Sequence, residues 1–251
     1  MTVYALQTEG LGVSFGRFRA VDGVSLNVAK GELRVLLGAN GAGKTTLMDL
    51  ISGRTRSTAG RVLLNGRDVT NLREFRIARA GIGRKFQIPS IFTGLTVRQN
   101  IEVAQSRHPG VFSNLRIGRS AADRARVEEV IDLVGLSDQM KTEAGTLSHG
   151  QIQWLELAML MIQSPEVILL DEPTAGMTQA ETGKTAAIIN RLKGDHTLLV
   201  VEHDMAFVRD IAEKITVLHL GRVLAEGTVA EIEGDAAVRA AYLGSQEISA
   251  C

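Results

Sequence analysis

The segment Gly38-Ala39-Asn40-Gly41-Ala42-Gly43-Lys44-Thr45-Thr46 places three glycines and a lysine between an apolar run and a helical pattern. The run Leu33 to Leu37 predicts a strand, and Lys44 to Ile51 has apolar residues at helical spacing before Gly53. Glycines between a strand and a helix let backbone amides turn inward around phosphate oxygens. We therefore expect an α/β fold that binds a nucleoside triphosphate.

The residues of this loop are expected to share the work of holding a triphosphate. Lys44 is expected to reach the β- and γ-phosphates, and the hydroxyl of Thr45 is expected to bind Mg²⁺. The other predicted nucleotide contacts in this segment are Gly38, Asn40, Gly41, Ala42, Gly43 and Thr46.

A second apolar run, Val167 to Leu170, ends in Asp171-Glu172. Carboxylates at the carboxyl edge of a sheet lie where ligands of open α/β folds bind. We expect Asp171 to hold Mg²⁺, directly or through water, and Glu172 to orient or deprotonate the attacking water. His203 follows the next such run, Leu198 to Val201, and is either a phosphate contact or an ordinary histidine at a strand end.

The composition argues against several classes of protein. Lys+Arg and Asp+Glu both number 28, so the net charge gives no electrostatic reason to expect nucleic acid as the main partner. The longest apolar run, Leu157 to Ile162, is far shorter than the roughly 20 residues of a membrane span. Met1 to Gly10 lacks the pattern of a secretory signal, so we expect cytosolic residence. The single cysteine, Cys251, cannot form an internal disulfide.

We expect one domain over residues 1–251, with a nucleotide-binding core at about 1–87 and 164–251 and a helical subdomain at about 88–163. Asn65-Gly66 between apolar flanks predicts an antiparallel hairpin in the first third of the chain. Buried parallel strands are expected at Val167–Leu170 and Thr197–Val201. Helices are expected at Val97–Ala104, Ala121–Val134, Ser148–Ile162, Gln179–Leu192 and, at the end of the chain, Glu231–Leu243.

The run Leu147-Ser148-His149-Gly150-Gln151 stands at a predicted helix start about twenty residues before Asp171-Glu172, with Ser148 as a good N-cap. This order of motifs resembles the ATP-binding subunits of ABC transporters. The resemblance implies a P-loop ABC ATPase with an antiparallel β subdomain and a helical insertion, using ATP and Mg²⁺. It also implies a head-to-tail dimer, in which Ser148, Gly150 and Gln151 bind the γ-phosphate held by the opposite subunit.

The same resemblance assigns roles to residues that say little by themselves. His203 corresponds to the family's switch histidine. Gln87 corresponds to its glutamine loop, which senses Mg²⁺ and water near the membrane subunit. Phe15 is the expected adenine-stacking aromatic, with Phe18 as the alternative. The family usually has glycine where His149 stands, which we interpret as subgroup variation rather than a pH-sensing imidazole.

The subgroup resemblance is to branched-chain amino acid and urea importers, and within it most closely to the urea-importer ATPase of the UrtD type. We expect an ATP hydrolase that powers uptake of urea or short amides. The alternatives are a branched-chain amino acid importer of the LivG type and a soluble ABC ATPase that acts on ribosomes or DNA. The expected partners are a second ATPase subunit, membrane permeases and, indirectly, an extracytoplasmic solute-binding protein. The subunit would then lie at the cytoplasmic face of the membrane. Thr178 departs from the family pattern, which puts its cross-dimer contact in doubt.

Overall fold

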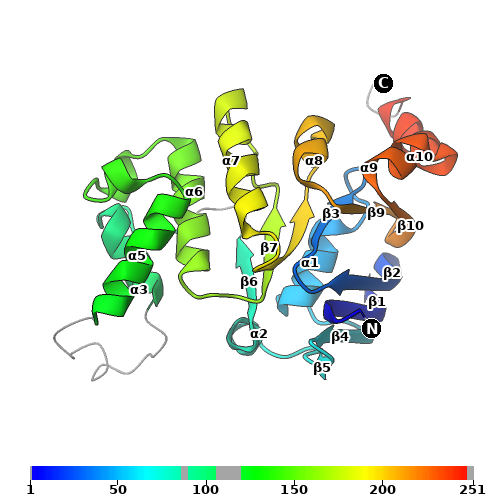
Figure 1. Cartoon of the computed structure of the whole chain (residues 1–251). Helices are drawn as coiled ribbons and strands as arrows, with labels where there is room; N and C mark the ends of the chain where they lie inside the picture. Colours follow the sequence, from blue (N-terminus) through cyan, green and yellow to red (C-terminus); the bar gives the residue numbers. More distant parts are fainter. Residues whose placement is uncertain (1, 86–89, 106–119, 248–251) are drawn as a thin grey trace. The chain divides into compact units, whose positions relative to one another are not determined.

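The computed structural model describes residues 2–85, 90–105 and 120–247, whose elements Figure 1 labels. The chain divides into two compact units. The core unit comprises Met1–Arg84, Glu166–Pro173 and Ile189–Cys251. The helical unit comprises Lys85–Pro165 and Thr174–Ile188. The stretch Thr174–Ile188, which the sequence placed in the nucleotide-binding core, groups with the helical unit.

One sheet of the core unit is antiparallel and has the strand order β2-β1-β4-β5. Its strands are β1 (Tyr4–Phe15), β2 (Phe18–Ala29), β4 (Ala59–Leu64) and β5 (Arg67–Asp68). Between β4 and β5, Asn65 and Gly66 have φ angles of 48° and 75°. Two positive φ angles are what a tight hairpin turn needs at its centre, so the predicted hairpin is confirmed.

The second sheet of the core unit has six strands in the order β10-β9-β3-β8-β7-β6. These are β3 (Leu33–Leu37), β6 (Ile82–Lys85), β7 (Val167–Asp171), β8 (Thr197–Val201), β9 (Lys214–His219) and β10 (Arg222–Gly227). Every residue of β3, β7 and β8 is buried, which explains why these strands are continuous apolar runs. They run parallel, so their carboxyl ends share one edge of the sheet (Figure 1).

The helices that belong wholly to the core unit are α1 (Lys44–Ser52), α2 (Glu74–Ala80), α8 (Met205–Ile211), α9 (Val229–Gly234) and α10 (Ala236–Glu247). The prediction of a single closing helix over Glu231–Leu243 is wrong, because α9 ends at Gly234 and α10 begins at Ala236, with Asp235 between them. The Asp235 carboxylate accepts hydrogen bonds from the amides of Ala237 (2.7 Å) and Val238 (3.0 Å). An aspartate that caps the first turn of a helix starts a new helix there.

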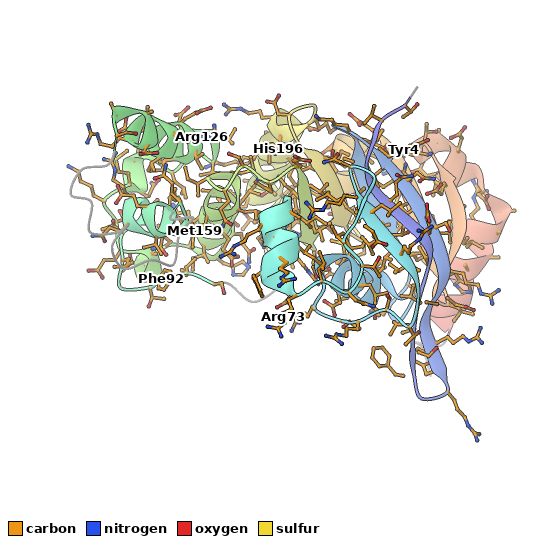
Figure 2. The ribbon with its side chains drawn as sticks, turned by 90° about the horizontal axis from the view of Figure 1, so that it is seen from below. Tyr4, Arg73, Phe92, Arg126, Met159 and His196 are labelled. Atoms are coloured by element: carbon orange, nitrogen blue, oxygen red, sulfur yellow. The ribbon has the colours of Figure 1, made fainter. Side chains whose placement is uncertain are left out.

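The helical unit contains α3 (Val97–Gln105), α5 (Ala121–Leu133), α6 (His149–Met161) and two short 3₁₀ turns (Ser137–Gln139 and Ala144–Thr146). Figure 2 labels Arg126 on α5 and Met159 on α6. Ile101, Ile131 and Leu155 are fully buried and supply part of the core of this unit. The three helices predicted here are confirmed to within one residue at each end. Helix α7 (Gln179–Leu192) begins in the helical unit and ends in the core unit.

Candidate nucleotide-binding site

The glycine-rich segment lies between β3 and α1, at the edge where the parallel strands end. A Cβ atom at Gly38 would lie 2.5 Å from the Leu218 carbonyl oxygen, and one at Gly43 would lie 2.6 Å from that of Ala20. Gly43 also has a φ of 101° and precedes α1 with no side-chain cap. Only glycine fits such close backbone contacts and this conformation. The first amides of α1 therefore receive no hydrogen bond from the side chain of the preceding residue.

Lys44 is buried at the start of α1 and folds back over the loop. Its ammonium donates hydrogen bonds to the carbonyl oxygens of Gly38 (2.6 Å) and Ala39 (3.1 Å). Burial lowers the pKa of Lys44, against the opposing charges of Glu172 and Asp171. A partly desolvated ammonium bonded to two backbone carbonyls can exchange these partners for phosphate oxygens. Thr45 and Asn40 are exposed on the same segment.

The carboxylate of Asp171 is buried at the end of β7, with 2% of the residue exposed. Its Oδ2 lies 3.5 Å from Arg84, whereas its Oδ1 is buried without a hydrogen-bond partner among the described residues. Burial raises the pKa of Asp171, and the nearby Arg84 guanidinium opposes that rise. A buried carboxylate oxygen with no partner is costly. This oxygen is therefore well suited to bind a cation, as the Mg²⁺ prediction requires.

Arg84 is a member of this site that sequence reasoning missed. Its guanidinium donates to Asp49 (2.6 Å) and Ser52 (2.8 Å), both on α1, in addition to its contact with Asp171. Arg84 therefore connects the helix after the phosphate loop to the carboxylate at the end of β7. Its position beside Lys85 in the sequence gave no sign of this, because the partners lie far away along the chain.

Glu172 and His203 follow neighbouring strands and are brought together. The Glu172 carboxylate lies 3.6 Å from Nδ1 of His203, and the Glu172 amide donates to the Val201 carbonyl at 3.0 Å. Glu172 has a φ of 47°, an unusual conformation for a residue with a side chain. Such conformations concentrate at functional sites, where the surrounding structure holds them. A carboxylate and an imidazole in contact can hold and transfer a proton between them.

The two candidate aromatic residues face each other across the turn between β1 and β2. Phe15 and Phe18 are paired in the β-ladder, and 55% and 64% of their surfaces are exposed. Neither is a core residue, so both are available to a flat ligand such as adenine. The structure does not choose between them. Gln87 lies outside the described residues.

In the helical unit, the predicted N-cap of α6 is formed. The Ser148 hydroxyl accepts from the Gln151 amide at 3.3 Å, and the Gln151 side chain accepts from the Ser148 amide at 2.9 Å. Gly150, in the first turn, is buried. Nε2 of His149 lies 3.0 Å from the Ala175 carbonyl oxygen. His149 therefore contacts the loop before α7.

Comparison with known proteins agrees with this geometry. The sequence profile of a family described as ABC transporter matches residues 21–175, and a second, described as branched-chain amino acid ATP-binding cassette transporter, matches residues 222–248.

Two curated relatives extend over almost the whole chain. BraF of Pseudomonas aeruginosa, named as a high-affinity branched-chain amino acid transport ATP-binding protein, is 37% identical over 95% of this chain and 97% of its own. LivG of Escherichia coli K12, which carries the same description, is 36% identical over the same shares.

Solved structures lead to the same assignment. A crystal structure of an ATP-binding cassette of an ABC transporter in its ADP conformation has a TM-score of 0.84 and 30% identity, covering 97% of this chain and 99% of that one. The predicted fold class is confirmed. The chain belongs to the ATP-binding cassette family of ABC transporters and is an ATP hydrolase of that family.

Proposed function

We propose that this protein is the ATP-hydrolysing subunit of an ABC importer for branched-chain amino acids. The names of BraF and LivG support this solute, as does the profile matched by residues 222–248. The sequence motifs first favoured a urea importer. That solute has less support, because both relatives are named as branched-chain amino acid transport proteins. Its remaining support is the resemblance of the runs Ser148 to Glu156 and Asp171 to Thr178 to urea-importer ATPases.

The observation that carries the proposed chemistry is the unpaired Oδ1 of Asp171 beside the phosphate loop. In this proposal Asp171 and Thr45 hold Mg²⁺, with Gln87 as a further contact to the ion. Mg²⁺, when bound, supplies positive charge that offsets the negative charge of the phosphates. Among the described residues, no group of three or more His, Cys, Asp or Glu could hold a metal ion. Mg²⁺ commonly takes one or two carboxylates from protein and keeps phosphate and water as its other ligands.

The remaining predicted residues divide between holding the nucleotide and activating water. Lys44 neutralises the terminal phosphates, and the loop residues Gly38, Asn40, Gly41, Ala42, Gly43 and Thr46 hold them. Glu172 orients the attacking water, and His203 holds Glu172 in place and contacts the γ-phosphate. Phe15, or Phe18 in its place, stacks on adenine. Catalysis then depends mainly on position and charge.

The proposed assembly contains two ATPase subunits, identical or related, and two membrane permeases. Both units of this chain act together as one nucleotide-binding domain. The start of α6, with Ser148, Gly150 and Gln151, binds the phosphate of the nucleotide held by the second subunit. No helix in the described part of the chain is long and apolar enough to cross a bilayer. We propose that attachment to the membrane depends on the permeases and that the solute-binding protein acts through them.

Transport by cells lacking this gene tests the solute. Uptake of labelled leucine and of labelled urea is measured in the deletion strain and in the same strain complemented with the wild-type gene or with the Lys44→Ala variant. We expect leucine uptake to be lost on deletion and restored only by the wild type, with urea uptake unchanged. Loss of urea uptake alone would reverse the choice between the two solutes.

A further inference from the structure

The start of α6 has an anionic neighbour within its own unit. Oε1 of Glu181, on the first turn of α7, lies 3.5 Å from the Ser148 hydroxyl. The same carboxylate lies directly against Gly150, where a Cβ atom would overlap it. The first turn of a helix favours a negative charge, because the helix dipole is positive there. Glu181 therefore occupies the end of α6 where a phosphate is proposed to bind.

Glu181 also holds the start of α7. Its Oε2 accepts hydrogen bonds from the amide and the hydroxyl of Thr178, both at 2.9 Å, and the Glu181 amide donates to Thr178 Oγ1 at 3.3 Å. These bonds from Thr178 lower the pKa of Glu181, with smaller contributions from Ser148 and His149. Glu181 is therefore a carboxylate anion at neutral pH, and one side chain connects the first turns of two helices.

A second contact joins the same two regions. His149 approaches the Ala175 carbonyl, and its Nε2 would lie 3.3 Å from a Cβ atom at Gly176, which has a φ of 74°. The loop 174–178 thus contacts the start of α6 directly at His149, and it is linked to Ser148 through Glu181. In the sequence only Pro173 separates this loop from Glu172. Movement at the start of α6 therefore has a short path to the residue proposed to activate water.

The Ser148 hydroxyl cannot serve two anions at once. A serine hydroxyl has one proton to donate, and its oxygen already accepts from the Gln151 amide. A phosphate that reaches the start of α6 meets the Glu181 carboxylate already beside Ser148, and two like charges within a few ångströms repel each other. The carboxylate must withdraw or the phosphate binds weakly.

We propose that Glu181 is a positioning residue that competes with the terminal phosphate of the partner subunit's nucleotide for the Ser148 hydroxyl. Binding of that phosphate displaces the carboxylate, loosens the Thr178 cap and frees the loop 174–178 next to Glu172. The arrival of one subunit's nucleotide is thereby communicated to the other subunit's own hydrolytic site. This inference rests on the proposed function, since it requires a second subunit to present the phosphate.

The test measures dimerisation against ATP concentration. In the Glu172→Gln background, which is expected to bind ATP without hydrolysing it, sedimentation in Mg-ATP gives the ATP concentration at half-dimerisation. Adding Glu181→Gln removes one negative charge beside the phosphate and should lower that concentration about three- to tenfold. The shift should shrink as salt is raised, because salt screens charges at the surface.

Glu231→Gln is the matched control. Glu231 accepts from the amide (2.7 Å) and hydroxyl (3.0 Å) of Thr228 in the same kind of capping box, but it belongs to the core unit. The Glu231→Gln variant therefore removes the same charge and weakens the same kind of cap as Glu181→Gln. It should leave the ATP concentration at half-dimerisation unchanged. Thr178→Val removes the cap hydroxyl without changing the charge and should produce no salt-dependent shift.

Each outcome decides a separate point. Absence of an ATP-dependent dimer in Glu172→Gln would overturn the proposed assembly and this inference with it. A dimer whose ATP requirement is unchanged or raised by Glu181→Gln would overturn the inference alone. Equal shifts of the half-dimerisation concentration in Glu181→Gln and Thr178→Val would also overturn the inference alone, because the shift would then come from loss of the helix cap and not from loss of the charge. Should Glu181→Gln not fold, Glu181→Asp keeps the charge, withdraws it from Ser148 and should give a smaller shift in the same direction.

Discussion

Helices α1 and α6 are both proposed to bind phosphate at their first turns, but those turns are satisfied differently. The first four amides of any helix lack partners within it. At α1 the preceding residue is Gly43, which offers no side chain. At α6, Ser148 and Gln151 bond to each other's amides, and the Glu181 carboxylate lies alongside. The start of α1 is open to a ligand, whereas the start of α6 already has internal partners.

The difference suggests an order of events. The first turn of α1, with Lys44 close by, has both the open amides and the positive charge needed to hold phosphate. The first turn of α6 contains no Lys or Arg, and the Glu181 carboxylate already lies beside it. A nucleotide should therefore bind first to the core unit of one subunit. It should meet α6 of the second subunit only when the dimer closes.

Lys44→Ala should have the largest effect and tests the α1 half of the comparison. Removing the Lys44 ammonium should lower ATP hydrolysis by about a thousandfold, because this charge is proposed to stabilise the negative charge that develops on the phosphates. The rate of phosphate release at saturating Mg-ATP measures this loss of hydrolysis. Lys184 is the control: burial also lowers its pKa, but it lies 3.7 Å from the Trp154 ring on α6. Lys184→Ala retaining hydrolysis within about threefold would support the assignment, and an equal loss in both variants would contradict it.

Asp171→Asn should lower hydrolysis by about a hundredfold and also stabilise the protein without Mg²⁺. Because burial raises the pKa of Asp171 in the folded state, the unfolded state holds fewer protons between the two pKa values. The free energy of unfolding of the wild type should therefore fall as pH rises through the folded pKa of Asp171. The asparagine variant should lack that fall, and urea unfolding at several pH values measures it.

Two results would contradict this account of Asp171. The first is an unfolding free energy that the asparagine variant lowers at neutral pH in the absence of Mg²⁺. The second is a stability advantage of the asparagine variant over the wild type that persists when Mg²⁺ and ATP are added, since ligand binding at the wild-type carboxylate should remove this difference. Asp22→Asn is the control, because Asp22 is ion-paired with Arg222 and its pKa is lowered.

The phosphate loop and the acidic pair could be predicted because local rules determine them. Glycines before Lys44 and a continuous apolar strand before Asp171 leave few other structures for these segments. Arg84 and Glu181 escaped prediction because their partners lie far from them in sequence or belong to another helix. A charged residue on an otherwise ordinary segment carries no sign of which distant group it will meet. The break at Asp235 had a local sign, an aspartate in N-cap position, which the helical periodicity on both sides obscured.

Ser148→Ala tests the α6 half and should have a smaller effect. Loss of the cap hydroxyl should lower the free energy of unfolding by about 1 kcal/mol. Hydrolysis should fall about tenfold, with little change in nucleotide binding by the isolated subunit, because α6 is proposed to contact only the partner's nucleotide. Thermal unfolding, phosphate release and ATP titration separate the three quantities. A loss of binding in the monomer would mean that α6 contributes to its own subunit's site, which would erase the proposed difference between the two helices.

The smallest effect concerns the aromatic residues of the core unit. Stacking of one base on an aromatic ring contributes about 1–3 kcal/mol. Replacing the stacking residue by alanine should therefore raise the KM for ATP roughly tenfold. Phe15→Ala is expected to do so and Phe18→Ala is not, although both are exposed and directly paired. Because stacking acts on ground state and transition state alike, kcat should be unchanged. The reverse result would transfer the role to Phe18. If neither variant alters KM, nucleotide binding at α1 depends on the phosphates alone, and the contrast with α6 would rest entirely on Lys44 and the open amides.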